Sequence, residues 1–299
     1  MRLHGKLLFA AALAQAVAGC SGKPADLHGL PDDDSQRATL CSKAALAYAG
    51  VAEQLAMPAE EQQRRSELLQ NVVSATDYFG VTNQSEEQGK KALADIETTL
   101  TGGQWLDTLN RCKAAYDLGP AEKVPELPTA PGDKIAACGA ASLIASLDGR
   151  KVDEVKNPIS DAQAAYFMML LARENSGNMS TAETALVKQV TEVAAGGAAV
   201  TLRDQCVAAY PKAKVGSEVT LPADEEAATM GCSLAAELLV QAGGEDAKRG
   251  EALKKKLNLM ALASSFLRGN LETRTIDAFT ALGTAPDVAT ACEKRYTGA

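Results

Sequence analysis

The segment LPDDDSQRATLC (residues 30–41) decides the fold, because its frame returns as LPTAPGDKIAAC (127–138) and LPADEEAATMGC (221–232). Each copy places Leu-Pro at one fixed distance before a cysteine. A cysteine that recurs after 97 and then 94 residues in such a frame is typical of an internal repeat. The sequence therefore predicts three tandem copies of one small domain. The three cysteines are Cys41, Cys138 and Cys232.

A second cysteine follows in each copy, and a tyrosine stands four residues after it. Four residues are about one helical turn, so each sulfur and each ring should share one face of a helix. We therefore expect each ring to pack on a disulfide. The pairs are Cys112 with Tyr116, Cys206 with Tyr210, and Cys292 with Tyr296.

The repeat also selects a disulfide pairing. The six cysteines after residue 20 allow fifteen pairings, which sequence alone normally leaves open. One bridge inside each copy is the economical solution, and each bridge closes a loop of roughly 60 to 70 residues, worth about 4 kcal/mol in the chain-entropy model. A domain of this size has a marginal core and commonly needs such a bridge. The predicted bridges are Cys41–Cys112, Cys138–Cys206 and Cys232–Cys292.

Apolar residues in the first copy have the spacing of an amphipathic helix. Asp34 or Ser35 is the expected N-cap of this helix. Pro58 is the expected first residue of a second helix, which should end at Gly80. The apolar stripe of the first helix consists of Leu40, Ala44, Ala47, Tyr48, Val51 and Leu55.

A third helix is expected from Ser85 to Gly102-Gly103, and a short fourth helix from Trp105. In the other copies the second helix should contain Met168–Leu171 and Leu257–Leu262. No segment alternates convincingly with the period of a strand, so we expect an all-α fold with about four helices in each copy. Segments 117–133 and 211–226, rich in Pro, Gly and charge, are the expected linkers. The predicted domains are residues 30–123, 124–217 and 218–299.

The first twenty residues have the pattern of an export signal. Arg2 and Lys6 precede an apolar run over residues 7–17, which is too short to span a membrane. The run closes with Val17-Ala18-Gly19-Cys20, which resembles the lipobox of bacterial lipoproteins.

That resemblance implies that residues 1–19 are a removed signal peptide and that Cys20 is lipidated. Residues 20–29 are then a lipidated tether, and two or three acyl chains anchor a protein stably. Ser21 after the cysteine resembles the outer-membrane sorting state of enterobacterial lipoproteins. The expected location is therefore the periplasmic face of the outer membrane.

Composition argues against several classes of function. The chain of 299 residues has a net charge of -8 and is only 4% aromatic, which disfavours nucleic-acid binding. Its two histidines, His4 and His28, both precede the first predicted helix, so the helical body cannot form a His-based catalytic pair or zinc site. It also lacks CxxC, GxGxxG and P-loop strings. We expect no catalytic residue, no metal and no cofactor.

The remaining candidate features favour structural interpretations. The acidic runs Asp32–Asp34, Glu60-Glu61 and Asp224–Glu226 suit helix N-termini and solvated faces better than a cation site or a catalytic pair. Trp105 is expected to anchor helices rather than to be an exposed recognition residue. The basic cluster is expected to be a solvated face, with an anion-binding role as the alternative; it consists of Lys248, Arg249, Lys254, Lys255 and Lys256.

Small exported helical domains with one cysteine early in the first helix and another in the last resemble two bacterial envelope groups. One is the acid-stress chaperones of the HdeA type, and the other is the periplasmic immunity proteins that neutralise type VI secretion effectors. From the lipobox, the repeat and the missing catalytic motifs we expect a non-enzymatic protein anchored by lipid that binds an envelope protein partner as inhibitor, chaperone or assembly accessory. The alternatives are a cell-wall-active enzyme that uses a carboxylate pair and a structural component of an envelope complex.

Overall fold

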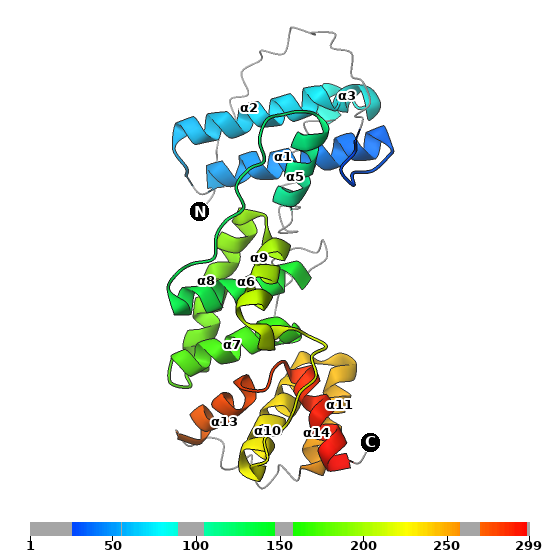
Figure 1. The fold of residues 1–299 in the computed structure, drawn as a ribbon. Helices are drawn as coiled ribbons and strands as arrows, with labels where there is room; N and C mark the ends of the chain where they lie inside the picture. The colour runs from blue at the N-terminus through cyan, green and yellow to red at the C-terminus, as the bar shows by residue number, and fades with distance from the viewer. Residues whose placement is uncertain (1–25, 55, 89–104, 147–157, 258–269, 298–299) are drawn as a thin grey trace.

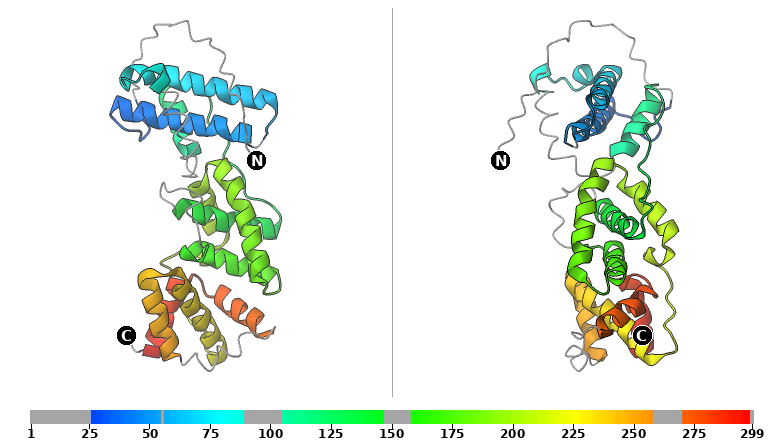
Figure 2. Two further views of the ribbon diagram at one scale, coloured as in Figure 1. Left: turned by 180° about the vertical axis from the view of Figure 1, so that it is seen from behind. Right: turned by 90° about the vertical axis from the view of Figure 1, so that its left-hand side faces the viewer.

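The protein is all-α in the computed structural model, which describes residues 26–54, 56–88, 105–146, 158–257 and 270–297. Its helices form three groups stacked along one long axis (Figure 1). The two further views show the same stacking from behind and from the side (Figure 2). Cys20, the predicted lipidation site, and the predicted signal peptide lie outside the described residues. Of the helices that the structure describes, none has the length and apolar character needed to cross a bilayer.

The first helix group contains two long helices that pack side by side, and a shorter helix crosses them (Figure 1). The second and third groups follow along the axis. The first group comprises α1 (Asp34–Gln54), α2 (Ala59–Ala75), α3 (Tyr78–Val81) and α5 (Trp105–Ala115). The second comprises α6 (Pro131–Ser146), η4 (Pro158–Ser160), α7 (Ala162–Glu174), α8 (Met179–Gly196), α9 (Ala199–Ala209) and η5 (Pro211–Ala213). The third comprises α10 (Glu225–Ala242), α11 (Gly244–Lys256), α13 (Asn270–Thr280) and α14 (Ala285–Thr297).

One disulfide joins the first and last α-helix of every group. The Cα atoms of the bridged residues are 5.7, 5.5 and 5.8 Å apart, and all six cysteines are fully buried. Each bridge therefore links helices that are 60 to 71 residues apart in sequence. These are the pairs that the repeated spacing predicts, namely Cys41–Cys112, Cys138–Cys206 and Cys232–Cys292.

The second and third groups share one hydrophobic core, whereas the first group has its own. A single cluster of buried residues contains both Cys138–Cys206 and Cys232–Cys292. Tyr166 of α7 reaches into the third group, where its hydroxyl donates to the carbonyl oxygen of Thr280 at 3.2 Å. Residues on both sides of the predicted boundary at 217/218 thus pack against one another. Buried apolar surface contributes about 25 cal/mol per Å², so this contact couples the stability of the two groups.

Three helix ends differ from those expected. Helix α1 begins at Asp34, and its cap is Asp33, whose carboxylate accepts the N–H of Gln36 at 2.8 Å. The second helix, α2, begins at Ala59, so Pro58 precedes it as the N-cap. The third difference concerns Gly80.

Gly80 does not end the second helix. Helix α2 ends at Ala75, and the chain turns at Asp77, which has a left-handed backbone with φ 49° that Asp tolerates better than most residues. Gly80 lies inside the short helix α3, and a Cβ there would stand 2.4 Å from the Asp77 carboxylate. Gly80 therefore lies close to the Asp77 side chain and is not a helix stop.

The start of the expected third helix lies within the described residues. The N–H of Gln88 donates to Ser85 Oγ at 3.2 Å and the N–H of Ser85 to Gln88 Oε1 at 3.1 Å, the reciprocal pair of a capping box. The rest of that helix, to Gly102-Gly103, lies outside the described residues, as does most of Leu257–Leu262. In the second group Met168–Leu171 lies in α7 and is buried.

Candidate functional site

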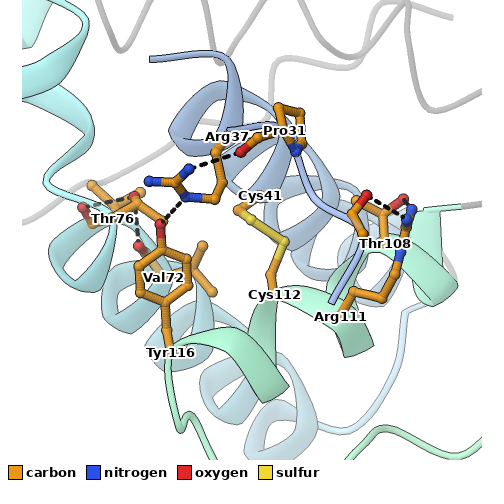
Figure 3. The surroundings of a disulfide bond; sticks show 11 residues. Pro31, Arg37, Cys41, Val72, Thr76, Thr108, Arg111, Cys112 and Tyr116 are labelled. Carbon is orange, nitrogen blue, oxygen red and sulfur yellow. Dashed lines mark hydrogen bonds between the residues drawn. A yellow bond between two sulfur atoms is a disulfide. The ribbon is translucent and has the colours of Figure 1, made fainter. Parts of the chain in front are cut away.

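The three tyrosines near the disulfides tie the last helix of each group to the group's other helices. The Nε of Arg37, one turn before Cys41, donates to the Tyr116 hydroxyl at 2.8 Å (Figure 3). The Tyr210 ring meets Phe167 edge-on at 5.6 Å between centroids. The Tyr296 hydroxyl donates to Glu225 at 2.8 Å. Each of the three tyrosines therefore contacts another helix of its own group.

The Leu-Pro frame has a physical role at the first helix of the first and third groups. Buried Arg37 donates through Nη1 to the carbonyl oxygen of Pro31 at 2.7 Å. In the third group Arg295 donates to the carbonyl oxygen of Pro222, also at 2.7 Å. A proline has no N–H to offer a partner, but its carbonyl remains a strong acceptor. The frame therefore fixes how the chain enters the helix that carries the disulfide.

Trp105 forms the joint between the first and second groups. Its ring stands against Gly197, the left-handed cap of α8, and a Cβ at Gly197 would lie 2.1 Å from the indole. The indole N–H donates to the carbonyl oxygen of Ala194 in the second group at 3.4 Å. Within the first group, Tyr48 of α1 contacts the ring with centroids 5.7 Å apart. Buried Ala198 belongs to the core of the first group. Trp105 is thus the interhelix anchor that the sequence predicts.

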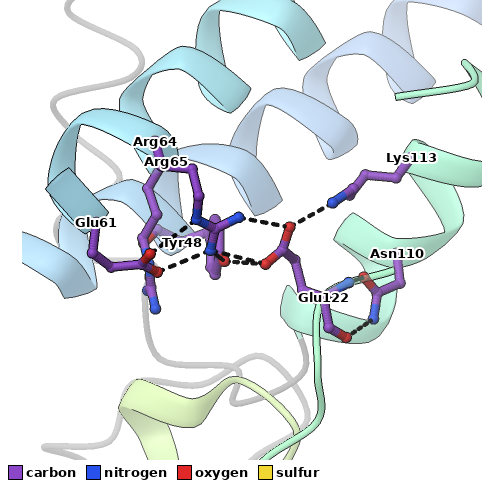
Figure 4. Close-up of polar contacts among 7 residues, drawn as sticks. All are labelled: Tyr48, Glu61, Arg64, Arg65, Asn110, Lys113 and Glu122. Atoms are coloured by element: carbon purple, nitrogen blue, oxygen red, sulfur yellow. Dashed lines mark hydrogen bonds and ion pairs between the residues drawn. The ribbon is translucent and has the colours of Figure 1, made fainter. Parts of the chain in front are cut away.

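A polar cluster around Glu122 fastens the first linker to the first group (Figure 4). The side-chain amide of Asn110 donates to the Glu122 carbonyl at 3.0 Å and accepts the Glu122 N–H at 2.7 Å. The carboxylate, only 12% exposed, accepts hydrogen bonds from Arg64, Lys113 and Tyr48. Cations and a hydroxyl from three helices therefore converge on one residue of the linker.

The protonation of this cluster follows from these contacts. Burial opposes ionisation of Glu122, but the hydrogen bonds from Arg64, Lys113 and Tyr48 outweigh it and lower its pKa to about 2. Hydrogen bonds from Arg64 and Arg65 likewise lower the pKa of Glu61 to about 2. Burial and the neighbouring Glu122 raise the pKa of Tyr48 to about 12. The carboxylates stay ionised and the phenol stays neutral near pH 7, so neither carboxylate is a proton donor at that pH.

Asp161 is the one carboxyl group, among those the structure describes, whose pKa is raised. Burial raises the pKa of Asp161, although the hydrogen bonds from the N–H groups of Ala164 and Gln163 and the charge of Arg203 lower it in part. Its carboxylate caps α7 by accepting the Ala164 N–H at 2.8 Å. The raised pKa is therefore found on a group with a structural task.

The basic and acidic runs are largely engaged in ion pairs and helix caps. Three of the five cations near α11 form ion pairs, while Lys255 and Lys256 are exposed. The three ion pairs are Lys248 with Glu245, Arg249 with Glu293, and Lys254 with Glu237. In the acidic run, Asp33 caps α1 and Asp34 pairs with Arg37.

A hollow of about 410 Å³ lies beside the first turn of α7, and sequence reasoning missed it. It is lined by α7 and, about 40 residues later in the chain, by α9 and the segment after η5, and none of its residues stands in a motif. The absence of any motif explains why the sequence carries no signal for it. Its lining residues are Gln163 of α7, Arg203, Asp204 and Val207 of α9, and Lys214 and Val215 after η5.

Comparison with known protein families, with characterised proteins and with solved structures returns no match to this chain. Its own residues therefore carry the functional argument.

Proposed function

We propose that the protein is a lipid-anchored periplasmic protein that binds an envelope protein partner and performs no catalysis. The observation that carries the proposal is that the ionisable groups with shifted pKa values make structural contacts. Tyr48 and Glu122 hold helices and a linker together. Glu61 pairs with Arg64 and Arg65 of its own helix, and Asp161 caps a helix. Catalytic sites are where shifted pKa values usually gather, and here the shifted groups serve the fold.

The architecture supports a binding role. Three helix groups, each held by a buried disulfide, follow one another along an axis, and this presents a long surface to a partner. Disulfides suit an oxidising compartment such as the periplasm. The resemblance to acid-stress chaperones and to immunity proteins makes an unfolded envelope protein or a secreted effector the partner classes to try first.

The test is capture of a partner from solubilised envelopes with the full lipidated chain as bait. A specific protein that elutes with this bait is the expected result. The matched control is the same chain after reduction and alkylation, which breaks the three disulfides and should release the partner. A bait that retains no protein in repeated experiments, or retains the same proteins after reduction, contradicts the proposal.

The anchor has a separate test. Cys20→Ala removes the thiol to which the lipid would be attached, so the variant should leave the membrane fraction. Ser21→Ala is the matched control, because it changes the neighbouring residue and keeps the thiol. If Cys20→Ala still sediments with membranes, the anchor lies elsewhere.

A further inference from the structure

The hollow beside α7 combines exposed apolar surface with two cations, Arg203 and Lys214, against one lining carboxylate, Asp204. Its volume of about 410 Å³ falls within the range of roughly 300 to 1,000 Å³ that ligand pockets occupy. Gln163 holds one wall in place, because its side-chain amide donates to the carbonyl oxygen of Ala213 in η5 at 3.1 Å. The wall that carries Lys214 and Val215 is therefore fixed to α7.

The apolar part of the hollow is Val207 and Val215. Val215 is 48% exposed, and among the described residues only Val187 is another large apolar side chain left exposed. Val207 is half-buried on α9. Covering an exposed valine with another apolar group removes both surfaces from water, which contributes about 25 cal/mol per Å². The hollow thus favours a ligand with a small aliphatic part.

The charged part is Arg203 and Lys214. The guanidinium of Arg203 meets Asp204 by a single long contact of 3.4 Å, and the Asp204 side chain is 68% exposed. Lys214 has no carboxylate partner among the residues that the structure describes. Buried Asp161 weakens the positive potential at Arg203, but it forms no ion pair with it in the described part of the chain. Most guanidinium donors of Arg203 and the ammonium of Lys214 therefore remain available to an anion, and a guanidinium fits a carboxylate in two parallel hydrogen bonds.

We propose that this hollow binds the carboxy-terminal residue of a polypeptide partner. The small apolar side chain of that residue lies on Val207 and Val215, and its α-carboxylate lies between Arg203 and Lys214. A polypeptide is favoured over a free aliphatic acid because the hollow is wide open to solvent. Small-molecule sites usually bury 70 to 90% of their ligand, and an open hollow cannot do so. The end of a longer chain needs less enclosure, since the rest of the partner contacts the surface around it. This inference rests on the proposed binding of a protein partner.

The test measures fluorescence anisotropy of a labelled hexapeptide that ends in Ala-Val-Val with a free carboxylate. The protein is the full lipidated chain in detergent. Saturable binding is expected, and the same peptide with an amidated end should bind at least about tenfold more weakly, because a charge-assisted hydrogen bond is lost. Arg203→Gln and Lys214→Gln should each weaken binding of the free-acid peptide by a similar factor. Lys212→Gln is the matched control, because Lys212 is an exposed lysine near the hollow but not part of its lining, and it should leave binding unchanged.

Three results overturn the inference. If the free-acid and amidated peptides bind equally well, the hollow does not recognise the carboxylate. Absence of saturable binding up to about 1 mM peptide removes the site. Displacement of the peptide by octanoate at the same concentration as by unlabelled peptide means that the site takes a small acid. Envelope capture with Arg203→Gln separates the two proposals. If this variant still retains a partner, the proposed function stands and the partner does not use the hollow. If neither the variant nor the unchanged chain retains a partner, the result counts against the proposed function itself.

Discussion

Gly197→Ala is expected to open the joint between the first and second helix groups. Gly197 has φ +66°, and an added Cβ would stand 2.1, 2.4 and 2.5 Å from three atoms of the Trp105 indole. Real Cβ atoms do not approach other atoms so closely. The indole is a rigid ring held by α5, so it must leave α8 for the methyl group to fit.

Two contributions make up the expected loss of stability. A left-handed backbone costs an alanine about 1 to 2 kcal/mol. If the displaced indole exposes roughly 100 Å² of apolar surface, a further loss of about 2.5 kcal/mol follows. Gly216→Ala is the matched control, because Gly216 has a similar φ of +82° with no atom within 4 Å of the added Cβ. The backbone cost is common to both variants, so the difference between them, about 2.5 kcal/mol, measures the contact with Trp105.

The assay is urea unfolding followed by tryptophan emission, which reports the joint directly because Trp105 is the single tryptophan of the chain. Gly197→Ala should also shift the emission of the native protein to the red, as the ring becomes solvated. In a Trp105→Phe background, followed by circular dichroism, most of the extra loss should disappear. The reasoning fails if Gly197→Ala destabilises no more than Gly216→Ala, or if the native emission does not change.

Two further predictions concern acid and reduction. The folded-state pKa of Glu122, about 2, lies below its ordinary value of 4.5, so its contribution is complete above pH 4.5 and is lost as the pH falls toward 2. The urea midpoint should therefore fall over this range, and Glu122→Gln should flatten the fall; equal slopes contradict the role of the cluster. Replacing Cys41 and Cys112 by Ala should destabilise by about 2 to 5 kcal/mol and increase hydrogen exchange mainly in the first group. Replacing Cys232 and Cys292 should also increase exchange in α7, because the second and third groups share a core; unchanged exchange in α7 means the groups are independent.

The repeated spacing could predict the disulfides because a fold that recurs along a chain brings equivalent positions together in every copy. Cys41 and Cys112 are far apart in sequence, but the equivalence of three frames reduces fifteen pairings to one. The helical secondary structure could also be predicted, because the periodicity of apolar residues is a local property of the sequence. The ends of helices are harder to predict, because neighbouring residues can play the same part. Asp33 caps α1 where Asp34 is an equally good candidate, and the chain turns at Asp77 where Gly80 is the expected stop.

The contacts of the polar cluster and of the joint could not be predicted, because they form between segments that no sequence pattern relates. Glu122 stands in a linker and looks like a solvated acid, yet its partners Arg64 and Lys113 come from two helices. Trp105 could be predicted to anchor helices, because it is the single tryptophan of the chain. Its partner Gly197 is one of many glycines, and only the structure shows that a glycine is required there.

The two linkers are each held by side chains of a neighbouring group, and this bears on how the array binds. Asn110 pairs with both backbone groups of Glu122 in the first linker, and the carboxylate of Asp287 accepts the N–H of Gly216 at 3.0 Å in the second. Fixed linkers reduce the entropy lost when a partner contacts more than one group at once. A variant that opens the joint, such as Gly197→Ala, should then weaken capture of a partner that spans the first and second groups, although no contact residue has changed. If the partner binds within one group, the same variant should retain it fully, so capture by this variant distinguishes an extended binding surface from a local one.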